Sequence, residues 1–264
     1  PPPSPPPLDL AAALLVSASP TGVPLGSPSS VTLAGAGFPA ALRADAVRCA
    51  FAPAAGDGGG GGDASGTPLE TAAESVDAAA SVVVCPVPTA GAAAGSYRVD
   101  LSLDRGASAL PAFFDAVFLE LYDPAGLGVA GVDPPGGPVA GGTRVTVTGS
   151  GFADYGPGQL CCSLGDGAAC DAAGELLTPG AGGALRVACT LPAAPSGGPE
   201  TAAVRVTVNG GLGGSVSASS APFVYYEHPV VSRLSPGQGD AAGGTLVTIA
   251  GSGFAALAGA DAAR

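Results

Sequence analysis

The chain alternates apolar and hydroxyl-bearing residues in short runs, and one such run recurs three times. VTLAG from Val31, VTVTG from Val145 and VTIAG from Val247 each place apolar side chains at every second position. A period of two is typical of a β-strand with one buried face, and no segment sustains the 3.6-residue period of an amphipathic helix. The pattern therefore predicts an all-β protein.

Each of these runs lies inside a longer repeat. SPTGVPLGSPSSVTLAGAGF from Ser19, DPPGGPVAGGTRVTVTGSGF from Asp133 and SPGQGDAAGGTLVTIAGSGF from Ser235 align without a gap. The closing Gly-Phe pairs recur at intervals of 114 and 102 residues by subtraction. Self-similarity at a long, regular interval predicts tandem copies of one structural module.

The alignment predicts four segments. A Pro-rich linker over residues 1–9 precedes repeat 1 over residues 10–124, which carries a Gly-rich insertion at 56–66. Repeat 2 covers residues 125–228, and a truncated third copy covers 229–264. The linker PPPSPPP is expected to form a stiff, solvated polyproline II spacer. Because the sequence has no Met and stops in mid-module, we expect it to be a piece of a longer protein.

The combined motif resembles the IPT/TIG family of immunoglobulin-like domains. It consists of a Pro, then GGTxVTxxGxGF, then paired cysteines and a closing aromatic strand. Repeats 2 and 3 carry Gly141–Thr143 and Gly243–Thr245, whereas repeat 1 has Pro28–Ser30 where GGT is expected. The resemblance extends from about Leu8 to Arg264 and implies tandem immunoglobulin-like (early-set) β-sandwiches.

Composition and charge limit the classes of partner that the chain is expected to bind. The chain has 44 Gly and 27 Pro, but its runs of Val, Thr, Leu and Phe suffice for a modest core. Its net charge is −12, and all nine basic residues are Arg. Such a surface repels phosphate backbones, so no nucleic-acid partner is expected. No stretch reaches the roughly 20 apolar residues of a membrane-spanning helix, so we expect no transmembrane segment in this sequence.

Six cysteines are the best sequence evidence for location. Four of them occupy equivalent places in repeats 1 and 2, and Cys161 has Cys170 nearby across a predicted turn. The candidate disulfides are Cys49 with Cys85, Cys162 with Cys189, and Cys161 with Cys170. Three plausible pairs favour a disulfide framework and an extracellular or cell-surface location, although spacing alone does not fix the connectivity. Reduced core thiols are the alternative, and zinc is disfavoured because there is no CxxC pair.

No group of residues is typical of an active site. The sole histidine, His228, lies at the junction of repeats 2 and 3, with no nucleophile aligned beside it. Four carboxylates fall in predicted loops, with no spacing that makes them converge as a glycosidase pair would: Asp154, Asp166, Asp171 and Glu175. We therefore expect no enzymatic activity.

The Gly-rich insertion does not predict a ligand site either. Asp57 and Asp63 flank a run of five Gly, but a calcium loop supplies several alternating oxygen ligands. Gly58–Gly62 lacks the Lys that accompanies a phosphate loop. We interpret the segment as a flexible insertion and expect neither a cofactor nor a metal.

The sequence favours a non-catalytic interaction or structural role with protein partners, in the ectodomain of a cell-surface or secreted protein. Such modules resemble the stalk repeats of plexins, hepatocyte-growth-factor-type receptors and fibrocystin-like proteins. The alternative is an accessory, carbohydrate-associated domain of a larger secreted enzyme, although the absence of Trp leaves few aromatic platforms for glycan binding. A DNA-contacting module of the Rel type requires a basic surface, which a chain without Lys does not offer.

Overall fold

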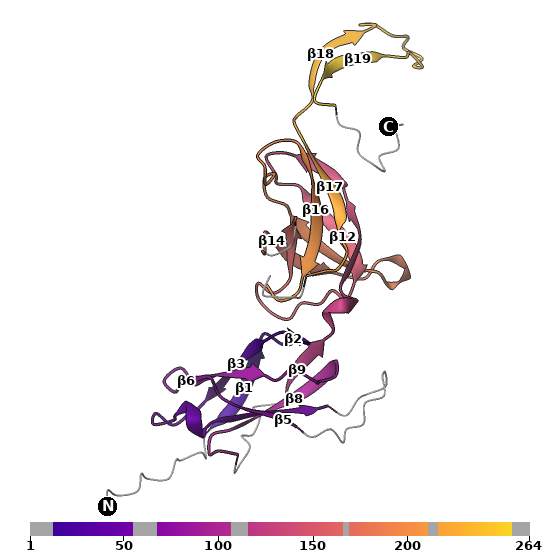
Figure 1. Ribbon diagram of the computed structural model, residues 1–264. Coiled ribbons are helices and arrows are strands. Elements are labelled where there is room, and N and C mark those ends of the chain that lie inside the picture. The colour runs from indigo at the N-terminus through magenta and orange to yellow at the C-terminus, as the bar shows by residue number, and fades with distance from the viewer. Residues whose placement is uncertain (1–12, 55–67, 107–115, 166–168, 211–215, 255–264) are drawn as a thin grey trace, which may run out of the picture. The chain divides into compact units, whose positions relative to one another are not determined.

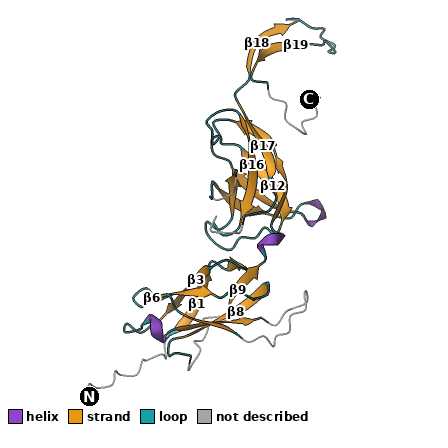
Figure 2. Cartoon of the chain, viewed as in Figure 1, coloured by secondary structure: helices purple, strands orange, loops and turns teal. Residues whose placement is uncertain are grey.

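A computed structural model of the chain shows strands joined by loops and short turns (Figures 1 and 2). It describes residues 13–54, 68–106, 116–165, 169–210 and 216–254. The Pro-rich linker and the Gly-rich insertion predicted from the sequence lie outside these residues. The chain divides into two compact units: unit 1 contains Pro1–Gly126 and Ala153–Gln159, and unit 2 contains Leu127–Phe152, Leu160–Gly211 and Val216–Arg264.

Unit 1 is built from two sheets. The four-stranded sheet has the order β1 (Leu14–Ser19), β3 (Ser29–Ala36), β7 (Val82–Val87), β6 (Ser75–Asp77). The five-stranded sheet has the order β2 (Gly22–Pro24), β9 (Val117–Tyr122), β8 (Gly95–Ser102), β4 (Arg48–Pro53), β5 (Leu69–Ala72). Neighbouring strands are antiparallel except β2 and β9, which run parallel.

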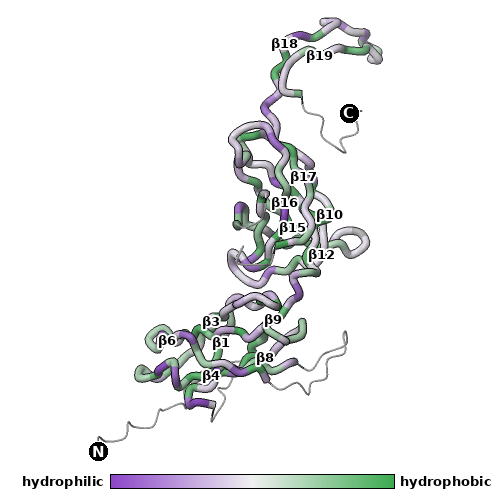
Figure 3. The backbone as a smooth tube through the Cα atoms, viewed as in Figure 1, coloured by the Kyte–Doolittle hydropathy of each residue, from purple (hydrophilic) through white to green (hydrophobic). Residues whose placement is uncertain are grey.

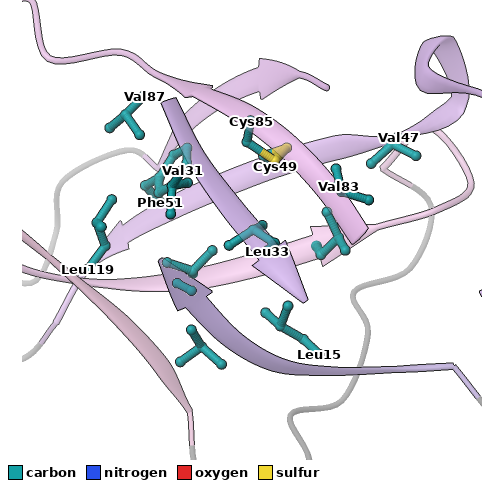
Figure 4. Close-up of a cluster of buried hydrophobic side chains, with 14 of the residues drawn as sticks. Leu15, Val31, Leu33, Val47, Cys49, Phe51, Val83, Cys85, Val87 and Leu119 are labelled. Carbon is teal, nitrogen blue, oxygen red and sulfur yellow. A yellow bond between two sulfur atoms is a disulfide. The ribbon is translucent and has the colours of Figure 1, made fainter. Parts of the chain in front are cut away.

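The core of unit 1 lies between these two sheets. Val31 and Leu33 of β3 are fully buried and face Phe51 of β4 and Leu119 of β9, which are also fully buried (Figure 4). The alternation predicted for the VTLAG run is therefore the alternation of buried and exposed side chains along β3. Burial of these side chains is the main favourable term that holds the layers together.

Unit 2 contains equivalent strands, but here they form one continuous sheet of eight strands. In sheet order they are β10 (Gly128–Asp133), β12 (Arg144–Ser150), β15 (Leu185–Thr190), β14 (Ala172–Leu177), β13 (Cys161–Leu164), β16 (Glu200–Thr207), β17 (Ala221–Tyr226) and β11 (Gly136–Pro138). Strand β14 pairs with both β13 and β15, so it joins the two layers. Val145 and Val147 of β12 and the edge-to-face pair Phe223–Tyr225 of β17 are buried in the core.

The third copy contributes the hairpin-like pair β18 (Val230–Ser235) and β19 (Thr248–Ser252). Its register shift between Val231 and Arg233 matches the shifts between Leu15 and Ser17 in β1 and between Val129 and Gly131 in β10. The three aligned sequence segments therefore have the same local structure.

The described residues contain no α-helix, and three 3-10 turns occur: η1 (Ala44–Ala46), η2 (Pro124–Gly126) and η3 (Ala181–Gly183). In Figure 3, hydrophobic segments run along the strands of both units. The all-β, immunoglobulin-like sandwich predicted from the sequence is confirmed.

One detail of the sequence alignment was shifted by a residue. Val31 lies opposite Cys85 and Val145 lies opposite Cys189, so the residues of repeat 1 that correspond to Gly141–Thr143 are Ser27–Ser29, not Pro28–Ser30. Gly141 and Gly142 both have positive φ, and the Gly142 amide donates to the Leu191 carbonyl. Proline has neither that φ nor an amide hydrogen, so the connection of repeat 1 takes another path.

Candidate interaction surfaces and disulfide framework

Two disulfides occupy equivalent places in the two units. Cys49 of β4 is bonded to Cys85 of β7, and Cys162 of β13 is bonded to Cys189 of β15. Their Cα–Cα distances are 6.3 Å and 6.2 Å. Each joins one layer of a sandwich to the other inside the core, and all four side chains are buried. Figure 4 shows the disulfide of unit 1, Cys49–Cys85. They act as internal covalent ties between layers.

A third disulfide is peculiar to unit 2. Cys161 of β13 is bonded to Cys170 across a Cα–Cα distance of 5.3 Å and a sequence separation of 9 residues. Cys161 is buried, whereas Cys170 is exposed. The residue of unit 1 that corresponds to Cys161 is Arg48, because both stand one position before the cysteine that ties the two layers. The described residues contain no free cysteine.

The other described polar residues singled out in the sequence lie in loops, except Glu175, which was predicted to lie in a loop but belongs to strand β14. His228 is exposed, Asp154 accepts a hydrogen bond from the amide of Gly156, and Asp171 accepts one from the amide of Leu164. Glu175 forms an ion pair with Arg144 at 2.6 Å. Asp57, Asp63 and Asp166 lie outside the described residues, and within those residues no three metal-ligating side chains come together.

Sequence reasoning missed an aromatic pair in unit 1. Tyr155, from the segment Ala153–Gln159 that belongs to this unit, stacks on Tyr122 with ring centroids 5.0 Å apart and planes at 11°. Its carbonyl accepts a hydrogen bond from the Thr21 amide. Burial raises the pKa of Tyr155 to about 12, with further contributions from the charges of Glu120 and Tyr122. The available signal was an aromatic residue in a loop otherwise made of small and polar residues.

Unit 2 has a shallow hollow of about 350 Å³ beside the start of β16 and the end of β17. The side chains that give it chemical character are Glu200, Tyr226, Glu227 and Phe254. Glu200 also accepts a hydrogen bond from the amide of Ser196. Two carboxylates and three aromatic residues, Tyr225 among them, line the hollow without a basic residue, so its chemistry favours a cationic group.

The repeated immunoglobulin-like sandwich with a buried disulfide tie defines the class of module, and comparison with known families agrees. The family model for the IPT/TIG domain matches residues 129–225 and 229–263, which make up half of the chain. The chain belongs to the IPT/TIG domain family.

Among characterised proteins, human Fibrocystin-L is similar to this chain. The two are 33% identical over 130 residues, which cover 48% of this chain and 3% of Fibrocystin-L. The chain therefore matches a small part of that relative's length. Across the residues that the structure describes, no helix is both long and apolar enough to cross a membrane.

Proposed function

We propose that this chain is a non-catalytic segment of a cell-surface or secreted protein, in which tandem sandwiches act as spacer and protein-binding modules. The observation that carries the proposal is the repeated IPT/TIG sandwich with a disulfide inside each complete copy. Disulfides of this kind persist in oxidising compartments and stabilise small extracellular domains. Similarity to Fibrocystin-L supports the same setting.

The mechanism we propose is contact through surfaces that the sandwich holds rigid, without a chemical step. Edge strands β2, β6 and β11 contain three residues each, which leaves little backbone for pairing with another sheet, whereas the edge strands β1 and β10 contain six residues each. Loops, outward-facing side chains and these two longer sheet edges are therefore the surfaces left for a partner. In unit 2, the hollow lined by Glu200 and Glu227 is suited to an Arg or Lys side chain of such a partner.

The compartment is tested by counting thiols in the native chain after expression through a secretory pathway. Peptide mapping by mass spectrometry is expected to find no free thiol and to recover the linked pairs Cys49–Cys85 and Cys162–Cys189. Alkylation of all six cysteines in the native protein would place the chain in a reducing compartment and overturn the proposal.

Binding is tested by presenting the immobilised full chain to a panel of purified extracellular protein domains and, in parallel, to a glycan array. We expect saturable binding to a protein ligand and no glycan signal above background. If the partner inserts a basic side chain, Glu200→Gln together with Glu227→Gln weakens binding, whereas Asp77→Asn on unit 1 leaves it unchanged. Binding to glycans and not to proteins would favour the carbohydrate-associated alternative.

A further inference from the structure

The three disulfides differ sharply in their access to solvent. Cys49, Cys85, Cys162 and Cys189 are each 0–1% exposed, so neither of the equivalent disulfides presents sulfur to an external reagent. In the third disulfide, Cys161 is equally buried, but Cys170 is exposed. Exchange at a disulfide requires a thiolate to reach one of its sulfurs along the S–S axis. Only a cysteine on the surface meets that requirement without opening of the sandwich.

The local structure around Cys170 does not depend on this disulfide alone. Strand β14 keeps four paired positions with β15, from Gly174 opposite Cys189 to Leu177 opposite Arg186. The amide of Gly174 also donates to the Leu160 carbonyl at 2.8 Å. By contrast, β13 and β14 share two paired positions. Opening Cys161–Cys170 therefore leaves the buried Cys162–Cys189 disulfide and the pairing of β14 with β15 in place.

We propose that Cys161–Cys170 is a thiol-exchange site, at which Cys170 is reversibly modified by small thiols and by dithiols. A thiolate attacks Sγ of Cys170, a new S–S bond forms to it, and the Cys161–Cys170 bond breaks. Cys161 leaves as a thiolate and takes a proton from water. With a dithiol, the second thiolate attacks the mixed disulfide, so the dithiol is oxidised and both cysteines are reduced.

This assignment gives unit 2 a covalent chemistry that unit 1 lacks. In unit 1 the position of Cys161 is taken by Arg48, and the one disulfide among its described residues is the buried Cys49–Cys85. The exchange does not require a known binding partner, so its test is independent of the proposed function. A failure of the exchange would leave the protein-binding proposal standing, and the reverse also holds.

The experiment treats the native, fully oxidised chain with limiting dithiothreitol and stops the reaction at intervals with acid. Thiols are then labelled with N-ethylmaleimide in denaturant, so that buried thiols react as well as exposed ones, and assigned by peptide mass spectrometry. Cys161 and Cys170 are expected to become labelled together, at least about tenfold faster than the other four cysteines. Equal rates for all three pairs, or earlier opening of Cys162–Cys189, would overturn the proposal.

A second arm identifies which sulfur is attacked. Oxidised chain incubated with reduced glutathione is expected to carry glutathione on Cys170 and not on Cys161, because Cys161 is buried. Glutathione mainly on Cys161 would contradict the mechanism. The control Cys161→Ala/Cys170→Ala is expected to lose the fast phase while the slow phase is unchanged. If that variant does not fold, the ranking of the three pairs in the unmodified chain still decides the question.

Discussion

Units 1 and 2 are built from equivalent strands, but the two layers of the sandwich are joined differently in each unit. In unit 2, strand β14 is continuous and pairs with β13 on one side and β15 on the other. In unit 1 the same region is split into β5, which pairs with β4, and β6, which pairs with β7. Described strands of unit 1 therefore form two separate sheets, tied covalently by Cys49–Cys85.

A single additional residue accounts for the split. Ala73 donates to the Val47 carbonyl just as Gly174 donates to the Leu160 carbonyl, so these two positions correspond. In unit 2, Glu175 follows directly and continues the pairing with β15. In unit 1, Glu74 intervenes before β6 begins at Ser75. One inserted residue shifts a strand by half its side-chain period, which ends one pairing and starts another.

The two units also place their large aromatic side chains on different strands. Phe51 of β4 and Tyr97 of β8 are buried in unit 1, and the corresponding residues of unit 2 are Leu164 and Ala202. Conversely, Phe223 and Tyr225 of β17 correspond to Leu119 and Leu121 of β9. The aromatic side chains missing from two strands of this layer in unit 2 are thus replaced on β17, a neighbouring strand of the same layer. A core tolerates such exchange when its total volume is kept.

The largest expected effect is the loss of the covalent tie in unit 1. Cys49→Ala/Cys85→Ala removes a disulfide with a sequence separation of 36, and chain entropy predicts a loss of about 4 kcal/mol in the free energy of unfolding. Because unit 1 has no described strand shared by both layers, we expect its layers to lose amide protection together. Hydrogen exchange followed by mass spectrometry measures this loss for each strand.

The matched variant is Cys162→Ala/Cys189→Ala in unit 2, with a sequence separation of 27 and an expected loss of about 3.5 kcal/mol. Here β14 still hydrogen-bonds to both layers, so peptides from β13–β15 are expected to keep more protection than those of β4 and β7 in the first variant. Greater loss of protection in unit 2 would show that the shared strand does not take over from the disulfide.

Truncation of a core side chain is expected to have different effects on stability at equivalent positions of the two units. Phe51→Ala removes a fully buried ring and is expected to lower the free energy of unfolding of unit 1 by about 3–4 kcal/mol. Leu164→Ala, at the corresponding but half-buried position of unit 2, is expected to cost about 1 kcal/mol. Denaturant titration of each variant, with hydrogen exchange to assign the unit, measures both values. Equal losses would contradict the expectation that the aromatic ring at this position of unit 1 contributes more to stability than the leucine at the corresponding position of unit 2.

The sequence was sufficient for the features that repeat in register. The runs beginning at Val31, Val145 and Val247 predicted strands because alternation fixes which face is buried, and the structure shows them as β3, β12 and the start of the β19 region. The aligned cysteines pointed to the pairs that the structure joins across each core. Both signals depend on local pattern and on equal spacing between copies, which one sequence with internal repeats contains.

Features that depend on single residues without an equivalent in the other repeat were not predictable. The segment from Leu69 to Asp77 has no clear alternation, so nothing marks Glu74 as the residue that divides β5 from β6. The exchange of aromatic volume between strands requires knowing which strands are neighbours in a sheet, and that information comes from the sheet order. The stacking of Tyr155 on Tyr122 is a contact between positions far apart in sequence, and no period reveals such a contact.

A smaller difference between the units is expected at alkaline pH. The pKa of Tyr155 is raised from 10.0 to about 12, so the folded chain holds this proton more tightly than the unfolded chain. The contribution to stability is therefore complete below pH 10 and is lost as pH rises from 10 to 12. After discounting for partial exposure of the hydroxyl, we expect about 1 kcal/mol to be lost from unit 1. Denaturant titrations between pH 9 and 12 measure it.

Tyr155→Phe is the control for this alkaline loss, because it keeps the stacked ring and removes the titrating hydroxyl. The variant is expected to reduce the decline of unit 1 above pH 10, and hydrogen exchange at each pH assigns the change to the unit. The pKa of Tyr225 in unit 2 is also raised, mainly by burial, so part of the decline in that unit is expected to persist in the variant. An unchanged decline in unit 1 would show that Tyr155 does not carry it.

The smallest effect is expected from the ion pair on the outer face of unit 2. Arg144 of β12 reaches Glu175 of β14 across β15, whereas the corresponding Ser30 of unit 1 donates a hydrogen bond to Glu74. Arg144 and Glu175 are 61% and 64% exposed, so Arg144→Ser is expected to lower the free energy of unfolding by less than about 0.5 kcal/mol.

Screening at about 1 M salt is expected to remove most of even this small contribution, and denaturant titration at low and high salt measures it. The size of the effect discriminates between two ways of holding β14 against β15. If backbone pairing and packing hold β14 against β15, the substitution and the salt both have little effect on the free energy of unfolding. Strand β14 is then continuous because unit 2 has no counterpart to Glu74. A salt-sensitive loss above about 1 kcal/mol would instead mean that the side chains of β12 and β14 clamp β15 between them. The split in unit 1 would then follow from the replacement of that arginine by Ser30 as much as from the inserted residue.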